Sequence, residues 1–148
     1  MQSMNAEVER TIIQFYPRRA LVSPLDDANV SWSWDVDNRE LKATVAALKA
    51  LDPDMRPGTR GSYDVSEELI LFGDVRVQLC YLAPFAAIDH QIRRGPDAEY
   101  RQQKRRIEQV LDAHGYELLL DRELEQHVPW IQPAGATVWE CLFVPPTH

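Results

Sequence analysis

Two apolar runs decide the fold, Val65-Ser-Glu-Glu-Leu-Ile-Leu-Phe72 and Val75-Arg-Val-Gln-Leu-Cys-Tyr-Leu82, and only Gly73-Asp74 separates them. A two-residue loop that contains glycine is typical of a tight turn between antiparallel strands. The two runs therefore predict a β-hairpin. Counting back from the loop pairs three sets of residues on the face that we expect to be buried, namely Phe72 with Val75, Ile70 with Val77 and Glu68 with Leu79.

The rest of the chain divides into further helices and strands. Apolar side chains recur at helical spacing over residues 5–16, 38–51 and 97–114, and residues 121–126 predict a helical turn. Residues 30–36 alternate strictly between apolar and polar side chains, which is typical of a half-buried strand that carries Trp32 and Trp34 on one face. Residues 116–120 and 136–144 predict two more strands.

The predicted order, α-β-α-β-β-α-β-β, indicates an α+β fold in which helices pack mainly on one face of an antiparallel sheet of about five strands. A length of 148 residues is that of a single domain, which we expect to span residues 1–148. We expect the core to include Trp32, Trp34, Ile70, Phe72, Val77, Leu79, Leu111, Val138 and Leu142.

Charge is unevenly distributed along the chain. The net charge is −7, yet residues 93–106 hold six cations and two carboxylates, a local charge of +4. The acidic overall field disfavours nonspecific nucleic-acid binding and favours basic partners. No apolar run approaches the roughly 18 residues that cross a bilayer, so we expect no membrane association and a reducing, cytoplasmic setting.

Local signatures of enzymes and cofactor sites are absent from the sequence. It contains no G-x-G-x-x-G, Walker A, H-E-x-x-H, G-x-S-x-G or C-x-x-C motif, so we expect no cofactor. A sheet-lined pocket with Glu140 as a general acid, or with Cys141 as a nucleophile beside a histidine, remains an alternative. In the interpretation without catalysis, Glu140 forms an ion pair with Arg76 or is exposed to water. Cys80 and Cys141 are then packed in the core.

Two other clusters invite a functional reading. A metal site would require Asp89 and His90 to meet His114 or His127, but these ligands do not form helical or hairpin pairs. The basic helix over residues 97–114 projects Arg101, Lys104 and Arg105 together, which suits phosphate or nucleic acid. A solvated outer face of an amphipathic helix explains the same cations without a ligand, and we favour that reading.

Three stretches resemble, in their general style, the immunity proteins that neutralise bacterial toxins. They are residues 75–84, the turn Gly115-Tyr-Glu-Leu-Leu119 and the segment Ala136-Thr-Val-Trp-Glu-Cys-Leu-Phe143. The resemblance implies a protein-binding inhibitor, with a cognate toxin or another basic protein as its partner, rather than an enzyme. Because connecting segments present side chains to partners, we expect the acidic interface to contain Asp26, Asp27, Asp121, Glu123 and Glu125.

Overall fold

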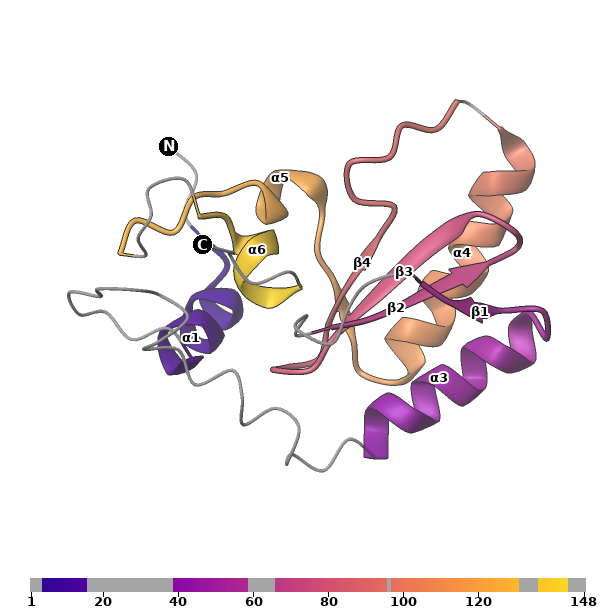
Figure 1. Ribbon diagram of the computed structural model, residues 1–148, viewed down its shortest axis with the longest axis horizontal. Coiled ribbons are helices and arrows are strands. Elements are labelled where there is room, and N and C mark those ends of the chain that lie inside the picture. The colour runs from indigo at the N-terminus through magenta and orange to yellow at the C-terminus, as the bar shows by residue number, and fades with distance from the viewer. Residues whose placement is uncertain (1–3, 16–38, 59–65, 96, 131–135, 144–148) are drawn as a thin grey trace.

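The structure, a computed structural model, describes residues 4–15, 39–58, 66–95, 97–130 and 136–143. It is an α+β fold, as predicted (Figure 1). Five strands form one sheet in the order β1-β2-β3-β4-β5: β1 (Arg56–Pro57), β2 (Ser66–Leu71), β3 (Val75–Cys80), β4 (Phe85–Ile88) and β5 (Glu117–Leu118). Neighbours are antiparallel except β4 and β5, which run parallel, so the sheet is mixed rather than purely antiparallel.

Two long helices cover one face of the sheet (Figure 1). They are α3 (Arg39–Leu51) and α4 (Ala98–Ala113), and their buried Leu48, Ile107 and Leu111 join Leu79 of β3 in one core cluster. The Asp97 carboxylate accepts the Glu99 backbone N–H and begins α4, and Gly115 with φ +78° follows its end. Both signals can be read from the sequence, and the bounds of α4 were predicted to within one residue at each end.

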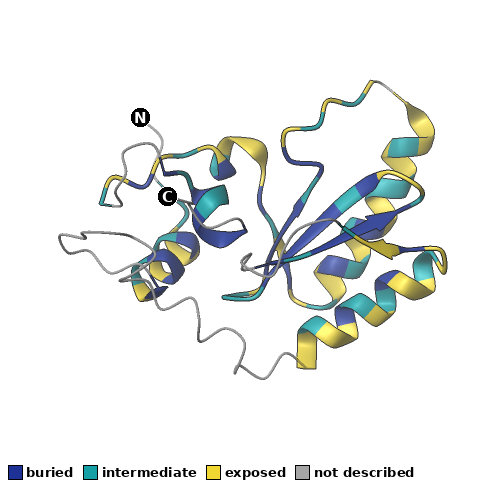
Figure 2. Ribbon diagram, in the orientation of Figure 1, coloured by how far each residue is buried: buried dark blue, intermediate teal, exposed yellow. Residues whose placement is uncertain are grey.

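The three shorter helices pack in a second core cluster. Side chains from the opposite face of the sheet complete this cluster. The helices are α1 (Ala6–Phe15), α5 (Asp121–Leu124) and α6 (Val138–Leu142). Cys80 and Ala87 belong to this second cluster, whereas their chain neighbours Leu79 and Ala86 belong to the first. Because successive residues of a strand point to opposite faces, the central strands are buried on both sides (Figure 2).

The hairpin is present, but its predicted register is wrong by one residue. Leu71 pairs with Val75, Leu69 with Val77 and Glu67 with Leu79, so the loop contains three residues rather than two. Phe72 is the extra loop residue and adopts φ +53°, next to Gly73 at φ +91°. The Phe72 N–H donates to the Asp52 carboxylate at 2.7 Å, which supports this unusual backbone conformation from the end of α3.

The register change exchanges the partners on the two faces. Leu69 and Leu71, which the predicted register left off the buried face, join Val77 and Leu79 under α3 and α4. Glu68 lies opposite Gln78 on the other face, and its carboxylate accepts a bond from Arg76 at 3.1 Å.

The remaining predictions of elements have mixed outcomes. Residues 136–144 were predicted as a strand, but residues 138–142 form helix α6. The strands β1 and β4 were not expected. Of the expected core, six residues are buried, namely Ile70, Val77, Leu79, Leu111, Val138 and Leu142. Phe72 is only partly buried, and the predicted strand 30–36 with Trp32 and Trp34 lies outside the described residues.

Candidate protein-binding site

An exposed leucine precedes helix α5. Leu120 is 45% exposed and is the only large hydrophobic side chain that is exposed in the described part of the chain. The next residues turn at once into α5, whose Leu124 is 1% exposed and anchors the helix in the second core cluster. The Glu123 carboxylate accepts the Leu120 N–H at 3.1 Å, which holds the start of the helix in place.

Carboxylates surround this leucine along the chain. Glu117, Asp121 and Glu125 are exposed, and Figure 2 shows the first half of α5 in the colour of exposed residues. Asn5, just before α1, donates from its side-chain amide to Glu117 at 2.6 Å and to Glu123 at 3.4 Å. This amide draws two carboxylates from different segments together. We call Glu117, Leu120, Asp121, Glu123 and Glu125 the α5 surface.

A buried histidine fixes the position of α5 against the sheet. His90 Nδ1 lies 2.9 Å from Asp121 Oδ1, and the His90 side chain is 1% exposed while that of Asp121 is 63% exposed. The imidazole also lies against the indole ring of Trp139 in α6, with 5.1 Å between ring centroids. The Trp139 Nε1 donates to Gln78 of β3 at 3.3 Å. The base of the α5 surface is therefore supported by side chains from β3, from the segment after β4 and from α6.

The backbone on both sides of His90 takes an uncommon conformation. Asp89 has φ +51° and Gln91 has φ +67°, in the region that residues other than glycine seldom occupy. The Asp89 carboxylate stabilises this bend because it accepts bonds from the Arg76 N–H at 2.9 Å, the Arg94 Nε at 3.0 Å and the Tyr100 hydroxyl at 2.7 Å. The bend turns the His90 side chain into the core.

Three of the five residues predicted for the acidic interface lie close together. Asp121, Glu123 and Glu125 lie together on and directly after α5, although Glu123 is half-buried and is engaged with Leu120 and Asn5. Asp26 and Asp27 lie outside the described residues. Sequence reasoning missed Leu120 and Glu117, and it considered His90 only as a metal ligand. The run Leu118-Leu119-Leu120 contains no polar residue that would reveal which leucine points outward.

Glu140 has a structural role, although its bonds are not those that the structural interpretation expected. It is the third residue of α6, and its Oε1 accepts the Thr137 N–H at 3.0 Å and the Thr137 hydroxyl at 3.1 Å. The Thr137 hydroxyl accepts the Glu140 N–H in return, which is a capping box. The predicted partner Arg76 binds Glu68 instead. Glu140 therefore caps the start of α6, and it does not line a pocket in the sheet as a catalytic role would require.

Neither cysteine is suited to nucleophilic chemistry. Both are buried, and neither forms a disulfide. Burial raises the pKa of Cys80 to about 12, and burial together with neighbouring Glu140 raises the pKa of Cys141 well above its ordinary value. The thiolate is the reactive form, so these environments suppress reactivity near neutral pH. This finding removes support from the alternative that uses Cys141.

The histidines do not converge on a metal site within the described residues. His90 binds Asp121, His114 Nδ1 lies 2.9 Å from Glu40 of α3, and His127 makes a backbone bridge to Thr137. No group of three or more side chains of the metal-ligating types comes together in the part of the chain that the structure describes.

The cations of the basic segment divide into those that contact other side chains and those that face solvent. Arg94 donates to both Asp89 and Asp74, and its side chain is 22% exposed. Arg106 lies over the ring of Phe72, with its guanidinium carbon 5.6 Å from the centroid. Arg101 and Arg105 are exposed on α4. Two of the cations therefore hold the hairpin turn and α4 in place, and the exposed face of α4 carries the remaining charge.

The chain matches no protein-family model, no curated protein and no solved structure. No helix among the described residues is both long and apolar enough to cross a bilayer.

Proposed function

We propose that the protein is an immunity-type inhibitor that binds a basic protein, a toxin, through the α5 surface. The observation that carries this proposal is the exposed Leu120 with carboxylates around it, on a helix whose base is braced by His90. Protein interfaces commonly combine an apolar centre, which is desolvated on binding, with a polar rim. A rim of carboxylates is complementary to a cationic partner and speeds its association.

The support for binding rather than turnover comes from the candidate reactive groups. The thiols have raised pKa values, and Glu140 is engaged in a capping box. By contrast, Asp121 and Glu125 have side chains in solvent, on an element that Leu124 holds in the core. The α5 surface therefore combines exposure with rigidity, which lowers the entropic cost of association.

The test is co-expression with the product of the neighbouring gene, followed by kinetic measurements on the purified pair. We expect rescue from toxicity and a complex whose association rate falls as salt is added. Asp121→Asn with Glu125→Gln should slow association and flatten its salt dependence. The matched control is Asp54→Asn with Asp112→Asn, which removes the same charge from exposed sites on other elements.

A third variant separates the apolar centre from its rim. Leu120→Ala should speed dissociation by about fivefold or more and leave the association rate almost unchanged. A fivefold change corresponds to a loss of about 1 kcal/mol of binding free energy. Equal behaviour of the α5 variants and the control pair would reject the α5 surface as the interface. A neighbouring gene product that is not a toxin, together with measurable turnover of a small substrate, would reject the inhibitor function itself.

A further inference from the structure

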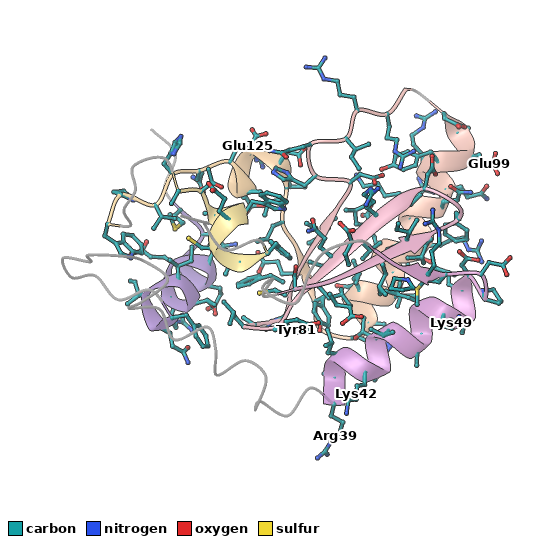
Figure 3. All side chains as sticks on the ribbon, viewed as in Figure 1. Arg39, Lys42, Lys49, Tyr81, Glu99 and Glu125 are labelled. Atoms are coloured by element: carbon teal, nitrogen blue, oxygen red, sulfur yellow. The ribbon has the colours of Figure 1, made fainter. Side chains whose placement is uncertain are left out.

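A pocket of about 490 Å³ opens between helix α3 and strands β2 and β3, on the side of the sheet that α3 covers. Its walls are largely apolar and come from Leu41, Val45, Ala46 and Met55. The volume lies within the range of roughly 300–1,000 Å³ that is typical of small-molecule sites. The pocket shares no residue with the α5 surface, and in Figure 3 Lys42 and Lys49 lie far from Glu125.

The pocket exists because of residue sizes along one stripe of α3. Leu41 and Val45 point partly into the first core cluster, whereas Ala46, one position further round the helix, is exposed and too small to cover them. A second pocket of about 330 Å³ adjoins the first, since both are lined by Leu41 and Tyr81. The hollow beside α3 therefore extends past Leu41 and Tyr81, beyond the first pocket.

Two lysines supply the charge at the mouth of the pocket. Lys42 and Lys49 are seven positions apart on α3, so both lie on the stripe that lines the pocket. Within the residues that the structure describes, Lys42 has no ion-pair partner, and Lys49 makes only a long bond of 3.4 Å to the Met55 carbonyl. Their ammonium groups are exposed on α3.

The carboxylate in the pocket is already engaged. The Tyr81 hydroxyl donates to Glu67 Oε2 at 2.7 Å, which occupies one of its acceptor oxygens. With one carboxylate against two lysines, the lining of the pocket carries a net positive charge. A cationic ligand would have to displace the tyrosine or share Glu67 with it, while an anionic headgroup meets two lysines that retain donors.

The geometry points to a binding site for a small amphipathic anion, a molecule with an elongated apolar body and one carboxylate. The body lies against Leu41, Val45 and Met55, and the headgroup binds Lys42 or Lys49 at the mouth. The flexible lysine stems reach a headgroup from either end of the stripe. This site is independent of the proposed function of the α5 surface.

The test uses decanoate and decyltrimethylammonium, which have the same chain and opposite headgroup charges. Each is titrated into the ¹⁵N-labelled full chain below its micelle-forming concentration, and amide shifts are recorded. We expect decanoate to shift resonances of Leu41, Val45, Met55 and Tyr81 saturably, and decyltrimethylammonium to bind at least about fivefold more weakly. No saturable shifts at these residues, or equal binding of the two probes, overturns the proposal.

Two sets of variants locate the site. Ala46→Leu should fill the pocket and abolish decanoate binding, whereas Ala43→Leu, also exposed on α3 but outside the pocket, should leave binding unchanged. Lys42→Gln with Lys49→Gln should weaken decanoate binding about fivefold or more, and Lys104→Gln on α4 should not weaken it. Unchanged binding by Ala46→Leu, with the fold confirmed by its spectrum, also overturns the proposal.

Discussion

His90 Nδ1 lies 2.9 Å from Asp121 Oδ1, and this bond joins the segment that follows β4 to the first residue of α5. The histidine is buried and the aspartate is largely exposed, so the bond connects the core directly to the α5 surface. Because Trp139 contacts the same imidazole, α5 and α6 share one buried support. The relative positions of Leu120 and its carboxylates therefore depend on this bond.

The first prediction concerns the His90 bond. Asp121→Ala should lower the free energy of unfolding by about 1 kcal/mol, because it leaves a buried imidazole nitrogen without its partner. Asp121→Asn keeps an acceptor oxygen and should lose less. Urea unfolding measures both. Asp112→Ala, at an exposed position of α4, is the control, and an equal loss in the control would contradict this role for Asp121.

The second prediction concerns the three-residue hairpin loop. Gly73→Ala should destabilise the protein by about 1 kcal/mol, because Gly73 has φ +91° and a Cβ is disfavoured there although nothing lies within 4 Å of it. Gly95→Ala is the matched control, since its surroundings are equally open and its φ is not positive. It should be neutral or slightly stabilising. If the two variants unfold at the same denaturant concentration, Gly73 does not have a positive φ.

The third prediction concerns alkaline pH. Burial raises the pKa of Cys80 from an ordinary value of 9.0 to about 12. Burial, with a smaller effect of the nearby Cys80 and Glu40, raises the pKa of Tyr116 from 10.0 to about 12. The unfolded chain therefore releases these protons at lower pH than the folded chain does. Stability is fully present below pH 9 and should fall as the pH rises from about 9 towards 12.

Urea midpoints measured across that pH range would check the third prediction. In Cys80→Ala the fall should be shallower but should still begin near pH 9, because Cys80 no longer contributes while the other buried thiol, Cys141, also has a raised pKa. The control is Cys80→Ala at neutral pH, which gives the packing cost alone. The same pH slope in the wild type and the variant would contradict the assignment to Cys80.

The fourth prediction concerns the basic helix. Arg101→Glu with Arg105→Glu should change stability by less than about 1 kcal/mol, because both side chains are exposed and neither has a described ion pair. Arg94→Glu should cost more, since Arg94 donates to Asp89 and Asp74. RNA or DNA binding that falls steeply with salt, and that the double variant abolishes, would favour the nucleic-acid alternative.

Helices α1, α3 and α4 were predictable because their signals are local. Each signal lies within a few positions of the helix that it specifies. The signals are the apolar stripe of residues 38–51, the Asp97 cap and Gly115. The acidic cluster at Asp121, Glu123 and Glu125 was predictable for the same reason, since residues so close in sequence stay close in any fold.

The corrections also have identifiable causes. Residues 136–144 have apolar side chains on both faces, which suits a central strand and a buried helix equally, and the Thr137–Glu140 capping spacing was the local signal for the helix. The hairpin register could not be read from alternation, because both faces of β2 are buried. It depended on whether Phe72 entered the loop.

The sequence by itself determined the α+β class, the hairpin, three helices and the acidic segment after residue 120, because propensity, capping and periodicity act over a few residues. Only the tertiary structure decided the hairpin register, the exposure of Leu120, and the meeting of His90, Asp121 and Trp139. These depend on contacts between segments distant in the chain. Asp52 supports the loop from 20 positions away, and Asp121 reaches His90 across 31. Their free energies arise only when the core clusters form, so no local pattern encodes them.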